Sequence, residues 1–148
     1  MKRIIIEKKK NVNVEAKKLF KEFKDYLGVE ELEDVRVLNL YDLMGGNDEE
    51  IKKVVEELLY EKPLDLIYED VLPITGDEKA LRVETRKGQY NQREDSTRKI
   101  IKNYMGLDEI DVKHSKVIVL KNITDENFEK VKSYYINPTE LTGIPLDS

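Results

Sequence analysis

The stretch Gly88–Ser96 holds the densest group of side chains that could do chemistry, in residues Gln89, Tyr90, Gln92, Arg93, Asp95 and Ser96. Planar and polar side chains stand here at the start of an expected helix, where packing on a core would need apolar ones. Arg93 and Asp95 could act as charged anchors and Tyr90 as an aromatic one, as in many protein interfaces. The pattern predicts a docking surface for another domain. The alternative is a solvated loop in which Asn91 caps the helix.

The sequence offers little for catalysis. His114 is the only histidine and there are no cysteines, which excludes a histidine triad, a two-histidine metal site, a thiolate site and disulfides. We expect His114 to be a partly exposed residue just before a strand. Gly45-Gly46 lacks the sequence context of a phosphate-binding loop. We therefore predict no catalytic residue, no metal site and no cofactor in this chain.

Composition narrows the class of protein further. The 148 residues are 39% hydrophobic and 39% charged, as in soluble globular domains. A net charge of −5 argues against a nucleic-acid binder, and Lys8-Lys9-Lys10 is better explained as a solvated strand end. The apolar run near the start is three residues long, too short for a signal peptide or a membrane span. We expect a cytoplasmic protein without a membrane partner.

Hydrophobic periodicity predicts elements that would position the docking residues. The first half of the chain should contain strands at 3–7 and 34–43, helices at 14–27 and 48–59, and an extended piece at 64–68. After a polar connection at 73–78, the second half should contain strands at 81–85 and 116–120 and helices at 92–105 and 124–135. Gly28 and Gly106 are expected to end helices, as are Pro63 and Asn137-Pro138.

The elements repeat, and so do residues within them. Tyr26–Leu32 aligns with Tyr104–Ile110 at an offset of 78, and Asn47–Ile51 aligns with Thr124–Phe128 at an offset of 77. The alternative is that two helix–glycine–strand segments look alike by chance. However, two separate segments align at nearly the same offset. The sequence therefore favours an internal duplication.

A duplication of this size has a consequence for the fold. Each strand–helix–strand–helix unit would be marginal alone, with an exposed sheet edge or face. Two copies could cover those surfaces as a homodimer does. We predict an α+β fold of two fused ferredoxin-like halves that form a pseudo-dimer, with antiparallel or mixed sheets.

Four segments resemble one known family. Gly88–Ser96 resembles the segment GQ(Y/F)DQRADSA near the N-terminus of phosphoribosylformylglycinamidine (FGAM) synthases of the large, single-chain, clostridial type. Arg3–Lys9 resembles the family's opening RR(I/V)(Y/F)VEKK, Asp34–Asp42 resembles DVRVLNRYDV, and Tyr134–Glu140 resembles YLINPVE. Asn91 replaces the family's aspartate, and Glu94 and Thr97 replace alanines. The resemblance covers essentially the whole chain.

The resemblance implies a fold, a role and partners. In that family this region is similar to two fused copies of the small subunit PurS, here 1–72 and 79–140, with 141–148 starting a linker to a synthetase domain. The full enzyme would use glutamine, ATP and Mg²⁺ to convert formylglycinamide ribonucleotide to its amidine in purine biosynthesis. This domain would be non-catalytic and would hold the synthetase and glutaminase domains of the same enzyme in register for ammonia transfer.

Two rival functions remain open at this stage. One is a free-standing module with ferredoxin-like halves that binds a small ligand between them or acts in regulation. The other is a small enzyme that uses a pair of carboxylates. The Gln89–Ser96 stretch is the one convergent polar group the sequence offers to either.

Overall fold

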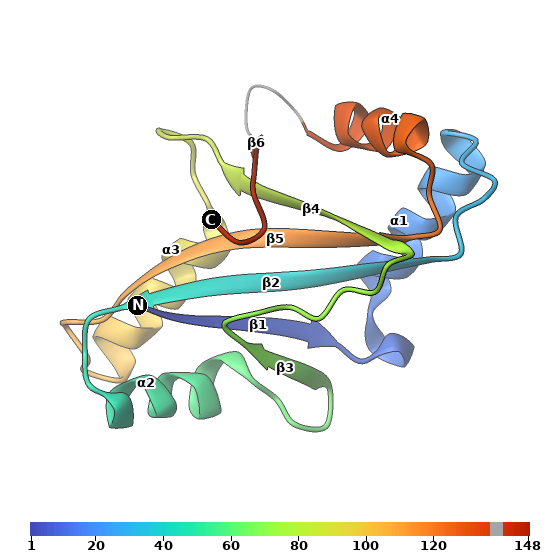
Figure 1. Cartoon of the computed structure of the whole chain (residues 1–148). Coiled ribbons are helices and arrows are strands. Elements are labelled where there is room, and N and C mark those ends of the chain that lie inside the picture. Colours follow the sequence, from blue (N-terminus) through green and yellow to red (C-terminus); the bar gives the residue numbers. More distant parts are fainter. Residues whose placement is uncertain (137–140) are drawn as a thin grey trace.

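A computed structural model describes residues 1–136 and 141–148 of the chain, with one continuous antiparallel sheet at its centre (Figure 1). The strand order is β3-β1-β2-β5-β4-β6. The strands are β1 (Lys2–Lys8), β2 (Asp34–Met44), β3 (Asp65–Glu69), β4 (Glu78–Thr85), β5 (Asp111–Lys121) and β6 (Leu141–Ile144). The protein is thus α+β, as predicted. The sequence predicts more than one sheet, whereas the long strands β2 and β5 pair along eleven positions and join both halves in one sheet.

The helices are α1 (Val14–Lys21), α2 (Asp48–Val54), α3 (Gln92–Lys99) and α4 (Asp125–Tyr135). The first three run on into wider π-helical turns at Glu22–Tyr26, Val55–Leu59 and Ile100–Tyr104. The predicted helices are confirmed to within a few residues at their ends. Gly28 and Gly106 follow two of them with φ of +73° and +70°, the left-handed conformation that ends a helix. The predicted stop at Asn137-Pro138 lies outside the described residues.

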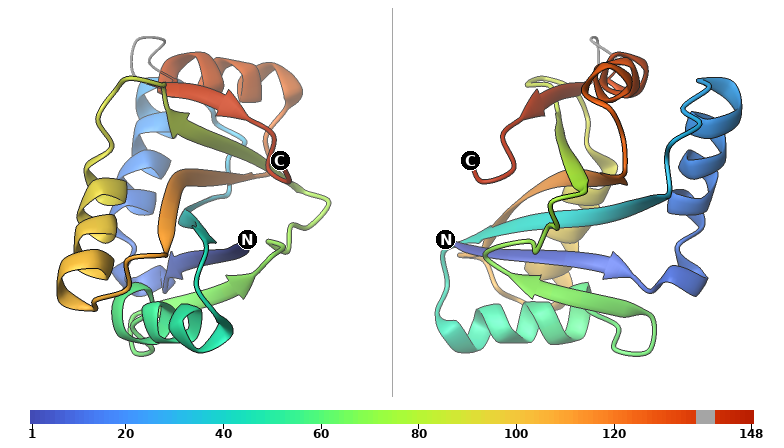
Figure 2. Two further views of the ribbon diagram at one scale, coloured as in Figure 1. Left: turned by 90° about the vertical axis from the view of Figure 1, so that its left-hand side faces the viewer. Right: turned by 45° about the vertical axis from the view of Figure 1, so that its right-hand side comes forward.

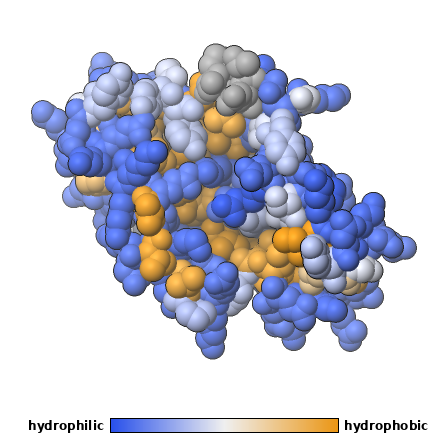
Figure 3. Space-filling model, turned by 180° about the vertical axis from the view of Figure 1, so that it is seen from behind, coloured by the Kyte–Doolittle hydropathy of each residue, from blue (hydrophilic) through white to orange (hydrophobic). Residues whose placement is uncertain are grey.

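All four helices pack on the same face of the sheet. One core joins α1 and α4 to Val35 and Val37 of β2. A second joins α2 and the π-helical turn after α3 to Tyr41 and Leu43 of the same strand. Because alternate strand residues point to opposite faces, these odd-numbered positions share one face. Seen from behind, in the space-filling view of Figure 3, hydrophilic side chains surround the apolar surface of that side.

The opposite face of the sheet carries a third core without a helix. Leu38, Leu40, Val117 and Val119 gather there under Leu72 of the segment between β3 and β4. In the left view of Figure 2, α1 and α3 lie on one side of the sheet, while that segment and the C-terminal end lie on the other. Leu146 packs against the same core. In the segment 141–148, where we predict the start of a linker, Leu141–Ile144 form the edge strand β6 beside β4.

The two halves share their pairing pattern. Strands β2 and β5 have eleven residues each, 77 positions apart, and Ile6–Asn39 in the first half has its counterpart 77 positions later in Val83–Lys116. Asn39 also pairs with Lys116 across the β2–β5 boundary. The offset read from the sequence therefore also relates the strand registers of the two halves.

Helix α2 begins with a capping box that can be tested. The Asn47 side chain accepts from the Glu50 N–H at 2.9 Å, and the Glu50 carboxylate accepts from the Asn47 N–H at 2.9 Å. We expect Asn47→Ala to lower the free energy of unfolding by about 1 kcal/mol, because the Glu50 N–H loses its side-chain acceptor. Urea denaturation would measure this. Lys53→Ala, on an exposed part of α2, is the control and should change stability by less than about 0.5 kcal/mol; equal effects would contradict the capping role.

Candidate functional site

The six predicted docking residues lie in the β4–α3 connection and the first turns of α3. Gly88 has a φ of +90°, and Gln89 N–H donates to the Arg86 carbonyl at 2.9 Å, which turns the chain after β4. Asn91 then caps α3 by accepting from the Glu94 N–H at 2.9 Å. Both interpretations of this stretch are thus compatible, since Asn91 is a cap while its neighbours remain exposed. We call Gln89, Tyr90, Gln92, Arg93, Asp95 and Ser96 the α3 surface.

Asp95 and Tyr90 interact with each other within this surface. The Tyr90 hydroxyl donates to Asp95 Oδ2 at 2.9 Å, and Lys99 Nζ lies 3.0 Å from the same oxygen. Lys99 and then Tyr90 lower the pKa of Asp95, and the bond to Asp95 raises the pKa of Tyr90. Tyr90 itself is 69% exposed. Asp95 therefore orients an exposed aromatic ring rather than standing free as an anchor.

Arg93 contacts the core of the sheet through Tyr41. Its Nη1 donates to the Tyr41 hydroxyl at 3.3 Å, and no other side-chain partner of Arg93 occurs in residues 1–136 or 141–148. Tyr41 is buried on β2, and burial raises the pKa of its hydroxyl. Most of the guanidinium's donors thus remain available to a partner.

The prediction for His114 was wrong. The structure places it inside β5, which begins at Asp111, and its side chain is buried. Its Nε2 is 2.8 Å from Asn39 Oδ1, and its Nδ1 is 3.2 Å from Asn91 Nδ2. A neutral ring satisfies both contacts if Nε2 donates and Nδ1 accepts. Burial, followed by the charges of Arg93 and Lys116, lowers the pKa of His114 to about 3.

Two cavities meet at Arg93. One of about 310 Å³ lies between β4, β5 and α3 and is lined by Tyr90, Gln92 and Arg93 together with His114. The other, of about 440 Å³, lies against Asn39 and Tyr41. The structure thus brings three of the six predicted residues to one cavity. Gln89 lines a different hollow beside Gly88, while Asp95 and Ser96 line none of these cavities.

The arrangement suits recognition of an anionic group. Arg93 and Lys116 both contribute to the lowered pKa of His114, and Lys116 is paired with Glu15 at 2.5 Å, so Arg93 is the cation left for a ligand there. A carboxylate set between the two cavities could accept a bidentate bond from Arg93. Within the described part of the chain, no group of three histidine, aspartate or glutamate side chains could hold a metal ion.

Sequence reasoning missed the residues that support Arg93. Tyr41 and Asn39 belong to β2 and reach the site because Tyr41 pairs with His114 across the β2–β5 boundary. The available signal was a polar Asn39 and an aromatic Tyr41 in a strand whose other core-facing residues are aliphatic. The predicted alternation of core-facing and outward-facing residues in β2 was right. Which residues of β5 lie beside Asn39 and Tyr41 depends on the β2–β5 register.

No helix within the described residues is both long enough and apolar enough to span a membrane.

Comparison with known proteins does not identify the chain. No family model and no curated protein matches the chain.

Proposed function

We propose that this chain is a PurS-like, non-catalytic scaffold domain of an FGAM synthase, the ATP- and glutamine-dependent ligase of purine biosynthesis. On this proposal ATP and Mg²⁺ act in the parent enzyme, in domains other than this one. The domain positions the synthetase and glutaminase domains so that ammonia passes between them. The four sequence segments that resemble the family are one line of support.

The observation that carries the proposal is the repeated register. Two fused copies of one subunit should pair their strands in the same way, and β1–β2 and β4–β5 do so at an offset of 77. We propose that the halves form a pseudo-dimer about an axis beside the Asn39–Lys116 pair. Residues 1–72 and 79–140 would then be the two PurS-like copies.

The α3 surface is the proposed contact with the other domains. Only the second half carries it, because the corresponding connection in the first half, Lys10–Glu15, leads through a short 3₁₀ turn into α1. Arg93 would be the central anchor, since it is exposed, is held by Tyr41 and keeps donors available. Tyr90 would add a rigid aromatic contact beside it.

The test is Arg93→Ala in the complete enzyme. We expect glutamine-dependent activity to fall about tenfold, because loss of one interface anchor of about 1.4 kcal/mol weakens docking by that factor. Activity with added ammonium salt should remain unchanged, because it bypasses the glutaminase. Steady-state rates with each nitrogen source would measure both.

Two variants sharpen the test. Arg93→Lys should retain part of the glutamine-dependent activity, since it keeps the charge but loses the bidentate geometry. Lys53→Ala, an exposed cation on α2, should change neither rate. If Arg93→Ala left both rates unchanged, or lowered both equally, Arg93 would have no role in coupling the two domains.

A second candidate function is the free-standing ligand-binding module. A cavity of about 510 Å³ lined by residues of the first half favours it. The two functions differ in their readout, since a ligand-binding module would bind its ligand without any other domain. A chain that restores no glutamine-dependent activity when added to the remaining domains would favour this alternative.

A further inference from the structure

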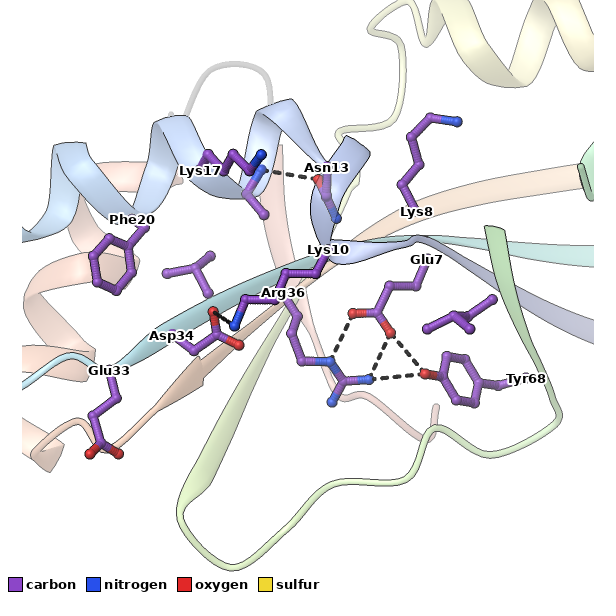
Figure 4. Close-up of a pocket in the computed structure, with 13 residues that line it drawn as sticks. Glu7, Lys8, Lys10, Asn13, Lys17, Phe20, Glu33, Asp34, Arg36 and Tyr68 are labelled. Carbon is purple, nitrogen blue, oxygen red and sulfur yellow. Dashed lines mark hydrogen bonds and ion pairs between the residues drawn. The ribbon is translucent and has the colours of Figure 1, made fainter. Parts of the chain in front are cut away.

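The first half has a cavity of about 510 Å³ between α1, the start of β2 and β3 (Figure 4). We call it the first-half cavity. Its apolar walls are formed by Ala16 and Phe20 of α1, Val35 of β2, and Leu66 and Tyr68 of β3. Its volume is within the range of about 300–1,000 Å³ typical of small-molecule sites. None of the α3 surface contributes to it.

The cavity exists because β1 is shorter than β2. The pairing of β1 with β2 ends at Glu7–Leu38, and the chain then leaves the sheet through the short 3₁₀ turn Lys10–Val12. The start of β2, Asp34–Arg36, therefore has a paired strand on its β5 side only. Its other side faces the cavity.

The backbone of Val35 points into this space. The Val37 carbonyl accepts from Asn13 Nδ2 at 3.2 Å, so the peptide groups of Val37 point away from β5. Backbone groups two residues apart in a strand point to the same side. The N–H and C=O of Val35 consequently offer one donor and one acceptor, side by side, at the cavity wall.

The second half closes the corresponding position with its own side chains. Val112 lies 77 residues after Val35; its N–H donates to Asp111 Oδ1 at 2.9 Å, and its C=O accepts from Arg98 Nη2 at 2.9 Å. The His114 N–H donates to Glu94 Oε1 at 2.9 Å. In the helices the two halves correspond at an offset of 78, as the caps Asn13 and Asn91 do. In the first half, Ala16 and Phe20 therefore stand at the positions of Glu94 and Arg98. These side chains cannot make such bonds, and an apolar wall takes their place.

Charged groups around the cavity favour an anionic ligand. Lys8, Lys10, Lys17 and Arg36 line it with Glu7, Glu33 and Asp34, which leaves one net positive charge locally in a chain of net charge −5. Arg36 is neutralised by Glu7, with two bonds of 2.9 Å. Figure 4 shows the lysines spread along the rim while Phe20 and Tyr68 stand on either side of Arg36. Lys8 lies 3.4 Å from Asp65, and Lys10 has a longer, exposed contact of 3.8 Å with Asp34. Lys17 has no carboxylate partner within the described residues and donates to the Asn11 carbonyl. Lys10 and Lys17 are thus the cations that an anion could reach.

We propose that the first-half cavity binds a small planar heterocycle that carries an anionic group, a nucleoside monophosphate being a ligand of this class. The ring lies against Phe20 and Leu66, its adjacent donor and acceptor atoms bond to the C=O and N–H of Val35, and its anionic group reaches Lys10 and Lys17. A peptide strand fits less well, because one residue position is open before the 3₁₀ turn blocks the edge. This binding is separate from the proposed scaffold role and does not depend on it.

The test titrates the full chain with adenosine monophosphate, adenosine and inorganic phosphate, followed by amide chemical shifts and hydrogen exchange. We expect adenosine monophosphate to shift the Val35 amide and to slow its exchange, and adenosine to do so with about tenfold weaker affinity. Phosphate alone should leave the Val35 amide unchanged. If no probe shifts this amide at millimolar concentration, or if the shifts gather elsewhere, the proposal is overturned.

Two variants decide the site. Phe20→Arg copies Arg98 of the second half and should weaken binding of adenosine monophosphate at least tenfold by filling the cavity. Tyr104→Arg, the same kind of change at an exposed residue, should not. Lys17→Ala lies on the surface and leaves the core intact, so it remains informative if Phe20→Arg does not fold. It should weaken the nucleotide severalfold and leave adenosine unchanged, and equal loss for both ligands would contradict the assigned anion contact.

Discussion

Replacing Asp42 with alanine is expected to lower the free energy of unfolding by about 3–5 kcal/mol, because it removes the carboxylate that two buried arginines share. Asp42 accepts from Arg3 Nε at 2.8 Å and from Arg3 Nη2 at 3.0 Å, and Arg82 Nη2 lies 3.7 Å away. The side chains of Arg3, Asp42 and Arg82 are 9%, 10% and 5% exposed. Chemical denaturation of the variant and the wild type would measure the loss.

The electrostatics of the cluster explain why one carboxylate matters so much. Hydrogen bonding to Asp42 raises the pKa of Arg3, whereas burial and then the charge of Arg3 lower the pKa of Arg82. The Leu146 carbonyl accepts from both arginines at 3.4 Å, and an oxygen of the last residue, Ser148, accepts from them at 2.6 and 3.0 Å. Asp42 is the carboxylate side chain that pairs with both arginines inside the sheet. Without Asp42 the two guanidinium groups would repel each other inside the protein.

An exposed ion pair provides the control. Glu56, in the π-helical turn after α2, lies 4.0 Å from Lys52 of α2, and both side chains are largely exposed. Glu56→Ala should change stability by less than about 1 kcal/mol. If Asp42→Ala were as mild as Glu56→Ala, water would have to reach Arg3 and Arg82, and the 145–148 tail would not seal this part of the sheet.

Local signals in the sequence were enough for most of the secondary structure. Asn47 followed by Glu50 marks a helix start, and Gly28 after an apolar stripe marks a helix end, because both act within one turn of the chain. The first residues of β5 were missed for a related reason. Asp111 and Lys113 alternate with Val112 and His114 in a polar run, and only their pairing with β2 shows that the even positions face the core.

The candidate site, too, could be predicted from the sequence only in part. The polarity of Tyr90 and Arg93 at a helix start was visible in the sequence, and so was the capping role of Asn91. Their meeting with Tyr41 and His114 depends on the β2–β5 register, which joins residues 73 positions apart. The first-half cavity depends on where β1 leaves the sheet. The difference between Phe20 and Arg98 could be read from the repeat, but it gained meaning only from the bond of Arg98 to Val112.

His114 should make the protein less stable as the pH falls below 6.5. Its pKa is about 3 in the folded chain and 6.5 when unperturbed, so the unfolded chain binds a proton first on acidification. Its contribution to stability is therefore fully present above pH 6.5 and is lost progressively as the pH falls towards 3. By pH 5 the loss should reach about 2 kcal/mol, from 1.5 pH units at about 1.36 kcal/mol each.

The variant His114→Gln isolates this effect, because glutamine cannot titrate and His114 is the only histidine of the chain. The measurement is the difference in unfolding free energy between pH 7.5 and pH 5, which should be about 2 kcal/mol smaller in the variant than in the wild type. Lost contacts to Asn39 and Asn91 lower stability at both pH values and cancel in that difference. Equal pH dependence in both proteins would mean that His114 becomes charged while folded. The ring would then have to be open to water, because burial is the main cause of its lowered pKa in the folded chain.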